Sequence, residues 1–392
     1  MRLRVVVPIL LVATIGWLAT IEALQLRSER QLEALAEPFV GVTTDGAPVD
    51  GLYQLRATGV STKPIRQAAM DFLEGLTDEQ RAATTYPVDS TEWRDWYNVH
   101  RAPREGVSFG EMDESQRKLA LRLFAASLSA KGLKKTTNVM RLNEHLAELI
   151  DKHDEYGDEF YFITVMGQPS AKGPWGWQLD GHHLVINYFV LGDQVVLSPS
   201  FMGSEPVIGS GEYAGVEVMQ DEQDKGLALM EALDEKQQAK AKLAEEKTRS
   251  NTLGAAFNDN LVLDYAGIRA DALTASQKSL LVEVIEEYVF NLREGHAKLR
   301  MEEIEAHLDE TYFAWIGTTG AEGVFYYRIH SPVILIEFDH QGPIALDGPR
   351  VPSRRHVHSV VRTPNGNDYG KDLLRQHYKA ERDNPSHGHD PG

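Results

Sequence analysis

The chain has 392 residues, 42% of them hydrophobic and 25% charged, which is a globular composition with enough apolar side chains for a sizeable core. Its 40 Lys and Arg residues against 58 Asp and Glu residues give a formal charge of −18, which disfavours binding to nucleic acid and general adsorption to anionic lipid. The absence of cysteine excludes disulfides, thiolate nucleophiles, zinc fingers and iron–sulfur clusters, so any metal would need ligands such as His, Asp or Glu.

The N-terminus carries the pattern of an export signal. Arg2 and Arg4 precede an apolar stretch over residues 5–20, which is shorter than the about 20 residues of a typical membrane-spanning helix. We therefore expect residues 1–24 to be a signal peptide or a signal anchor. The protein is then exported to the periplasm or the cell surface and meets a membrane only through this segment. Residues 25–59 are expected to form a linker or N-terminal segment.

Similar sequence blocks occur twice in the chain, in the same order and roughly 150 residues apart. The blocks begin at Leu76 and Leu233, at Met112 and Leu273, at Tyr161 and Tyr312, and at Asp224 and Asp368. Residues 60–225 and 226–380 are therefore expected to be the halves of a tandem duplication, followed by a disordered tail over residues 381–392. Asp113 and Thr274 are the expected N-caps of equivalent helices. The Glu- and Lys-rich residues 234–250 are expected to form a solvated helix.

Each half is expected to be a helical segment followed by a small antiparallel β-meander, which makes the fold class α+β. Short gaps between the predicted strands favour antiparallel pairing, because a parallel crossover needs a dozen or more residues. The two meanders could join into one sheet or face one another.

The halves differ most in their histidines and carboxylates. The first half places Asp180, His182 and His183 before an apolar strand, where the second half has His330 followed by Ser-Pro-Val. The second half also carries Glu337 within the run ILIEFDHQ, and the pair His356 and His358. In a strand, side chains at i and i+2 point to one face, so His356 and His358 have the geometry of an H-x-H metal site.

We expect these residues to form one site between the halves. The predicted metal ligands are His182, His183, His330, His356 and His358, with Glu337 or Asp180 as a further ligand or general base. Of the two adjacent histidines, His182 is favoured as the ligand because on a strand it shares a face with Asp180. The predicted substrate contacts are Arg328, Arg362, Trp177 and Tyr327. The alternative for the polar residues is a structural network of Glu–Arg or Asp–His pairs.

Histidine and carboxylate ligands without thiolate suit a divalent transition metal such as zinc, copper, iron or manganese. The expected function is therefore that of an exported metal-dependent enzyme, with hydrolysis of a small molecule or peptide as the favoured reaction. The alternative is a non-enzymatic binding module of the periplasm or surface that encloses a peptide, a sugar or a small acid. The sequence carries no signal for an oligomeric state.

Two long blocks of the sequence resemble a known family. WGWQLDGHHLVINYFVLGDQVVLSPSFMGSEPV, together with YYRIHSPVILIEFDHQ and HVHSVVRTPNGNDYGKDLLRQHY, resembles the bacterial and eukaryotic family catalogued as domain of unknown function 3500, over roughly residues 60–380. The resemblance implies membership and often an export signal, and it implies no particular activity. The family's blocks fall on Asp180, Gly181, His182 and His183, on Arg328 and His330, on His356 and His358, and on Asp368, Tyr369 and Gly370.

Overall fold

The computed structural model describes residues 29–383. The chain divides into two compact units, of which the first ends at Phe39 and the second begins at Val40. In the first unit, residues 29–36 are helical. Everything below concerns the second unit.

Two predictions for the chain ends can be compared with these limits. The expected signal peptide or anchor over residues 1–24 lies outside the described residues, as do residues 384–392 of the expected tail. Helix α10 (Lys371–Asp383) continues through residues 381–383, so the tail predicted to begin at 381 is wrong at its first three positions. Among the described residues, no helix has both the length and the apolar character needed to cross a membrane.

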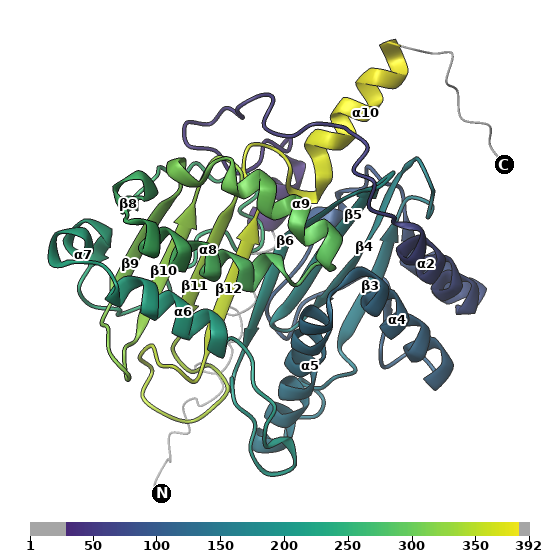
Figure 1. Ribbon diagram of the computed structural model, residues 1–392. Helices are drawn as coiled ribbons and strands as arrows, with labels where there is room; N and C mark the ends of the chain where they lie inside the picture. The colour runs from purple at the N-terminus through teal and green to yellow at the C-terminus, as the bar shows by residue number, and fades with distance from the viewer. Residues whose placement is uncertain (1–28, 384–392) are drawn as a thin grey trace, which may run out of the picture. The chain divides into compact units, whose positions relative to one another are not determined.

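One sheet of 12 strands forms the centre of the second unit (Figure 1). The first meander consists of β3 (Tyr161–Met166), β4 (Pro174–Gly181), β5 (Leu184–Leu191) and β6 (Gln194–Ser204). The second consists of β9 (Tyr312–Gly317), β10 (Phe325–His330), β11 (Leu335–His340) and β12 (Val357–Arg362). Strands β6 and β12 pair antiparallel at the centre, so the two predicted antiparallel meanders join into one sheet.

The strand order reads β1-β3-β4-β5-β6-β12-β11-β10-β9-β7. The short edge strands are β1 (Thr85–Tyr86), β2 (Val107–Ser108), β7 (Lys242–Ala244) and β8 (Ile268–Arg269). β1 is parallel to β3 and β7 is parallel to β9, whereas β2 and β8 pair antiparallel with the same two strands. Because β6 and β12 run in opposite directions, the β4–β5 turn and the β10–β11 turn lie at opposite ends of the strands.

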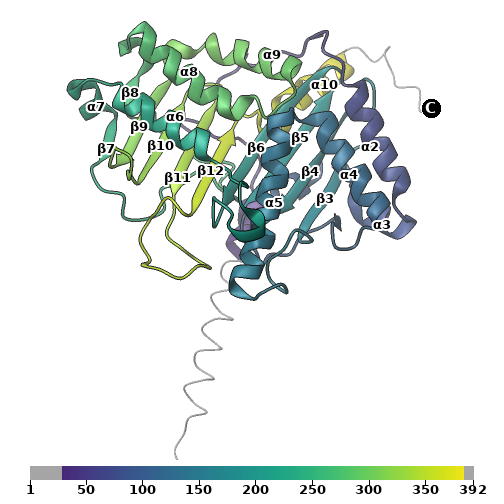
Figure 2. The ribbon, with the colours of Figure 1, turned by 60° about the horizontal axis from the view of Figure 1, so that its bottom comes forward.

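Helices cover one face of this sheet (Figure 2). On the first meander these are α2 (Lys63–Gly75), α3 (Asp78–Thr84), α4 (Glu114–Ser127) and α5 (Ala130–Ile150). On the second they are α6 (Gln220–Glu231), α7 (Glu235–Ala241), α8 (Ala275–Val289) and α9 (Glu294–Glu305). Trp177 of β4 donates from its indole nitrogen to Ser127 Oγ of α4 at 3.2 Å, and the Tyr327 hydroxyl of β10 lies 2.6 Å from that of Tyr288 in α8.

Four of these helices begin with a capping box, in which the N-cap side chain and the N3 side chain satisfy each other's backbone N–H groups. The N-cap and N3 residues are Thr77 and Gln80 (α3), Asp113 and Gln116 (α4), Asp234 and Gln237 (α7), and Thr274 and Gln277 (α8). The predicted N-caps of α4 and α8 are thus confirmed. The N3 glutamines also pair with each other, Gln80 with Gln116 at 2.7 Å and Gln237 with Gln277 at 2.8 Å.

Irregular segments over residues 88–104 and 247–264 cover the opposite face of the sheet. Gln178 of β4 donates to the Trp93 carbonyl at 3.1 Å, and Asp339 of β11 accepts from the Asn251 N–H at 2.7 Å. The solvated helix predicted over 234–250 is wrong, because α7 ends at Ala241 and β7 follows. The same run supplies Lys247, whose ammonium is buried 2.8 Å from Asp339.

The segment predicted as a linker over residues 25–59 contains ordered contacts from residue 40 onward. Thr43 forms a parallel bridge with Val262, and the buried Tyr53 donates its hydroxyl hydrogen to the Pro364 carbonyl at 2.7 Å. This stretch therefore packs against both the 247–264 segment and the end of β12.

Candidate metal centre

The doubled histidine forms the turn of a two-residue β-hairpin. β4 ends at Gly181, β5 begins at Leu184, and these two residues pair, so His182 and His183 lie in the loop between them. His183 has φ of 60°, which is the left-handed region, and its N–H donates to the Asn98 carbonyl at 3.2 Å. The strict alternation of a strand does not apply at these two turn positions.

The two turn histidines point to different partners. The His182 Nδ1 lies 2.7 Å from Asn143 Oδ1 of α5, and its ring stacks on that of His183 at a centroid distance of 3.9 Å. The His183 ring extends toward the start of β12. The choice of His182 over His183 assumed a continuing strand, and the turn geometry corrects it: His183 joins the other histidines.

Three imidazoles converge at this end of the central strand pair. His356 immediately precedes β12 and His358 lies within it, and the two share a face as predicted. The His183 Nε2 lies 3.1 Å from the Nε2 of His356 and 3.1 Å from that of His358, and the last two atoms are 3.0 Å apart. We call His183, His356 and His358 the histidine triad.

The chemistry of the triad fits a cation. Burial lowers the pKa of all three imidazoles below the ordinary value of 6.5, so each ring is neutral at pH 7 and has one nitrogen lone pair. The His356 Nδ1 lies 2.8 Å from the Gly342 carbonyl, which requires an Nδ1–H donor and leaves the Nε2 lone pair free. In a tetrahedral site with metal–nitrogen distances of about 2.0–2.1 Å, ligand nitrogens are about 3.3–3.4 Å apart, close to the observed spacing.

Glu205, the residue after β6, lies next to the His356 ring nitrogen that points away from the triad. Its Oε2 lies 3.7 Å from the His356 Nδ1, and its carboxylate accepts hydrogen bonds at 3.1 Å from three backbone N–H groups of the β11–β12 loop. The donors are Ile344, Ala345 and Leu346. Sequence reasoning missed Glu205, although an acidic residue directly after a long apolar strand was a usable signal. Such outer carboxylates commonly orient a metal-binding histidine.

Gly203 of β6 provides the space in which the rings meet. It pairs with His358, and its N–H donates to the His183 carbonyl at 2.8 Å. A Cβ at this position would lie 2.4 Å from the Val357 carbonyl oxygen, 3.1 Å from the His358 Cδ2 and 3.4 Å from the His183 Cδ2. Any larger residue here would therefore separate the two rings or shift the β6–β12 pairing.

The two carboxylates predicted as catalytic are buried on the same face of the sheet, but their hydrogen bonds go to the covering segments rather than to the triad. Asp180 accepts from the Arg104 Nε at 2.9 Å and from the Tyr97 N–H at 3.2 Å. Burial raises the pKa of Asp180 to about 6, although Arg104 opposes the shift. A catalytic role for Asp180 stays a prediction.

Glu337 binds the irregular segment over residues 247–264 through backbone hydrogen bonds. It accepts from the Gly254 N–H at 2.6 Å, from the Leu253 N–H at 3.0 Å and from the Tyr326 hydroxyl at 2.7 Å. Burial raises its pKa, and the same hydrogen bonds oppose that shift. The Glu337 carboxylate thus acts here as an acceptor for the backbone that crosses β11.

The predicted ligand His330 lies away from the triad. It pairs with Leu335, which pairs with Arg362, so His330 is at the opposite end of the strands from His356. Its ring lies 4.6 Å from that of Tyr265, centroid to centroid. The expectation that His330 would join the other histidines in one site is wrong, because the antiparallel joining of the meanders places the β4–β5 and β10–β11 turns at opposite ends of the strands.

The predicted substrate contacts also lie apart from the triad. Trp177 and Tyr327 are fully buried on the helix-covered face. Arg328 lies opposite Glu337 and donates to the Asp264 carbonyl at 3.3 Å. Arg362 is fully buried and forms ion pairs that hold the covering segment and the end of β12.

The partners of Arg362 are Asp259 at 2.9 Å and Asp368 at 3.0 Å. Asp259 also pairs with Arg94 at 2.8 Å, which joins the first covering segment to the second. The structural network that the sequence left as an alternative is therefore present around Arg362, while the histidine cluster is present at the triad.

The comparisons with known proteins give a family and no relative. A family model described as a protein of unknown function (DUF3500) matches residues 58–371. The search of curated proteins and the search of solved structures returned no match. The matched range includes His183, His356 and His358, and the expected resemblance is confirmed. Because the model matches well over half of the chain, the chain belongs to the DUF3500 family.

Proposed function

We propose that this protein binds one divalent transition metal ion through the Nε2 atoms of His183, His356 and His358. The observation that carries the proposal is the mutual spacing of 3.0–3.1 Å among these three atoms, contributed by a turn and a strand that are far apart in the sequence. Three neutral imidazoles satisfy one another poorly at this spacing, because each Nε2 atom either donates or accepts and one Nε2–H would have to be shared between two lone pairs. A bound cation would satisfy all three.

We further propose that the metal site is catalytic and hydrolytic. Three protein ligands leave a coordination position open, which is typical of catalytic rather than structural zinc sites. When bound, the metal would lower the pKa of a coordinated water and polarise a carbonyl or similar group of a small-molecule or peptide substrate. His358 is the half-buried member of the triad and marks the side from which solvent and substrate can approach. Imidazole ligands suit zinc, copper, iron or manganese.

The roles of the surrounding residues follow from their contacts. Gly342 and Glu205 orient His356 by receiving or attracting its Nδ1–H, so that its Nε2 lone pair faces the other two rings. Asn143 fixes the ring of His182, which in turn stacks on His183. Asp180 remains the proposed general base, because its raised pKa suits proton transfer near neutral pH.

We also propose that the fold arose by tandem duplication. The support comes from features that recur in order: the paired glutamines at the starts of α3 and α4 and of α7 and α8, and the parallel edge strands β1 and β7. Gly106 and Gly267 have φ of 93° and 94°, and a Cβ on either would meet a carbonyl oxygen, of Ile163 in β3 or Phe313 in β9. Export to the periplasm or surface remains part of the proposal on the N-terminal pattern alone.

Metal analysis of protein purified without a histidine tag tests the proposed function. We expect about one metal ion per chain, with a lower melting temperature after chelation. His358→Asn should lose the metal, whereas His330→Asn, which alters a buried histidine outside the triad, should keep it. Metal at trace level only in the wild-type protein, with melting unchanged by chelator, would overturn the proposal.

A further inference from the structure

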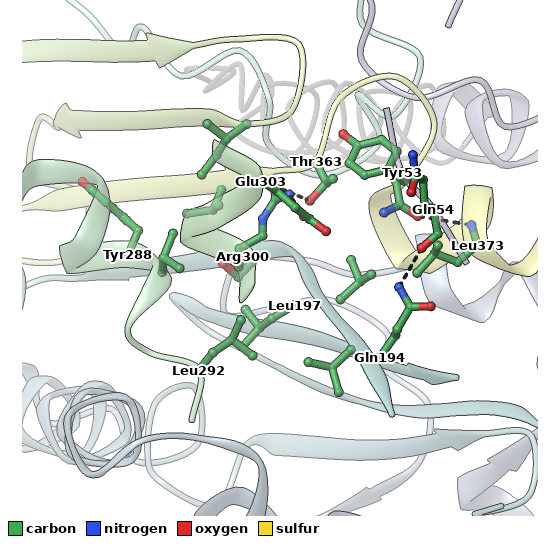
Figure 3. A pocket seen from close by; sticks show the side chains of 17 residues that line it. Tyr53, Gln54, Gln194, Leu197, Tyr288, Leu292, Arg300, Glu303, Thr363 and Leu373 are labelled. Atoms are coloured by element: carbon green, nitrogen blue, oxygen red, sulfur yellow. Dashed lines mark hydrogen bonds and ion pairs between the residues drawn. The ribbon is translucent and has the colours of Figure 1, made fainter. Parts of the chain in front are cut away.

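A small enclosed cavity lies between the central strands and helices α8 and α9, on the helix-covered face (Figure 3). Ser200 of β6 and Val361 of β12 form its floor and are paired with each other across the two strands. Tyr53 and Gln54, from the chain segment that precedes α2, also line the cavity. Its volume is about 50 Å³. The triad faces the other side of the sheet, so this cavity is a separate site.

The walls divide into an apolar part and a polar part. The apolar wall is made of Val196, Leu197, Val289, Leu292, Ile334 and Val361. The polar groups come from Arg300, Glu303, Thr363 and Gln194. Figure 3 shows Arg300 reaching from α9 into the space between these two parts. A cavity that places fixed polar groups beside apolar side chains can hold a small molecule that has both a polar and an apolar part.

Arg300 is held in place and keeps free donors. Its Nη1 pairs with Glu303 at 2.9 Å, and its Nη2 donates to the Val333 carbonyl at 2.6 Å and to Thr363 Oγ1 at 3.3 Å. These bonds use three of the five N–H donors of a guanidinium. Because the group is fixed from both α9 and the β10–β11 turn, it is preorganised for a ligand that enters the cavity.

A second hollow lies beside the cavity. A neighbouring hollow shares Gln194, Arg300 and Glu303 with it and adds Arg56 and His296. The Nε2 of His296, whose side chain is buried, finds no hydrogen-bond partner among the described residues. Arg56 lines only the neighbouring hollow, so Arg300 is the cation and Glu303 the carboxylate among the residues that line the cavity itself. An anion in the cavity would bind through the two remaining N–H donors of Arg300.

We infer that this cavity binds a carboxylate of two or three carbons, with the carboxylate at Arg300 and the alkyl group against the apolar wall. A water molecule needs about 10–15 Å³ of such volume, so the space accommodates about three to five non-hydrogen atoms. Acetate and propionate match that size. This inference does not depend on the proposed metal site.

Calorimetric titration of the purified full-length chain tests the inference. Propionate should bind saturably and hexanoate should not, because the longer chain exceeds the cavity. Propionamide has the same shape without the charge and should bind about ten- to a hundredfold more weakly, the range expected for loss of a charge-assisted hydrogen bond. Equal binding of propionate and propionamide, or no binding of propionate, would overturn the assignment.

Four variants locate the binding. Arg300→Met should weaken propionate binding about ten- to a hundredfold, and Arg293→Met, at the start of the same helix but outside the cavity, should leave it unchanged. Because Arg300 also contacts the β10–β11 turn, Ser200→Ile provides a second route: it fills the cavity from β6 and should abolish binding in a protein that still melts cooperatively. A folded Ser200→Ile protein with unchanged affinity would contradict the proposed location. His358→Asn should retain propionate binding, which separates this site from the metal proposal.

Discussion

The β4–β5 and β10–β11 turns both join the second and third long strands of a meander, but they carry different chemistry. In the first turn His183 adopts a left-handed conformation and points to β12. In the second, the Ser331 hydroxyl accepts from the N–H groups of Val333 and Ile334, and Asn365 donates to the Pro332 carbonyl. The backbone of the β10–β11 turn thus forms hydrogen bonds with Ser331 and with a residue outside the turn, whereas the β4–β5 turn supplies a side chain to a distant strand. The two turns therefore differ in whether a side chain leaves the turn, although both join antiparallel strands of one sheet.

Of the predicted variants, His183→Gly should have the largest effect on metal binding, because it removes the side chain that distinguishes the β4–β5 turn from the β10–β11 turn. Glycine adopts φ near 60° without the roughly 1–2 kcal/mol penalty of other residues, so the hairpin should persist while the imidazole is lost. We expect loss of stoichiometric metal with the melting temperature of the metal-free protein unchanged or slightly raised. Metal analysis and calorimetry measure both quantities.

The matched control lies in the other turn. Val333→Gly should leave the metal content unchanged, because that turn does not contribute to the triad. If His183→Gly still bound about one metal per chain, the triad would not be the site.

Gly203→Val should disturb the triad by adding a side chain where the rings of His183 and His358 meet. The added side chain must displace the Val357 carbonyl or the rings of His183 and His358. We expect a loss of about 1–3 kcal/mol in the free energy of unfolding, which is typical of overpacking, together with weakened metal binding. Chemical denaturation with and without chelator separates the two effects. A variant with wild-type stability and full metal content would show that the rings do not require this space.

Glu205→Gln should weaken metal binding about 10–100-fold, the usual effect of removing an outer partner of a ligating histidine. The glutamine can still accept from the loop N–H groups, so the protein should stay folded. Glu337→Gln is the matched control: it changes a buried carboxylate on the same face, should lower stability by about 1–3 kcal/mol, and should leave metal affinity unchanged. Competition titration with a chromophoric chelator measures affinity. Equal affinities of wild type and Glu205→Gln would contradict the role given to Glu205.

The smallest effect on metal binding is expected at His330, the last residue of β10, where the change concerns acid stability instead. Burial lowers its pKa from 6.5 to about 3, so the folded protein holds this imidazole neutral while the unfolded chain protonates it below pH 6.5. The stability contributed by the neutral form is therefore complete above pH 6.5 and is lost as the pH falls toward 3. His330→Asn should reduce the slope of stability against pH in this window by up to about 1.4 kcal/mol per pH unit. Urea denaturation at several pH values measures the slope, and an unchanged slope would rule out this source of acid sensitivity.

The sequence identified several features of the fold and the site because they are local. Asp113 and Thr274 were predicted as N-caps from their residue type at the starts of two similar blocks. The alternation of a strand placed His356 and His358 on one face. The same alternation failed at His182 and His183, since a hairpin turn interrupts it. Glu337 was predicted as a ligand or general base and Arg362 as a substrate contact, with a structural network as the alternative. Several of their partners lie in irregular segments that have no periodicity to read.

The sequence by itself determined which histidines were candidates for the triad, the α+β class with its two antiparallel meanders, and the N-caps of α4 and α8. These follow from residue identity and from contacts between near neighbours in the chain. Only the tertiary structure decided that His183 rather than His182 contacts His356, that Glu205 lies next to the Nδ1 atom of His356, and that Arg300 lines a cavity. Each of these depends on the register of β6 against β12, and that pairing is set by packing over the whole sheet rather than by any short stretch of sequence.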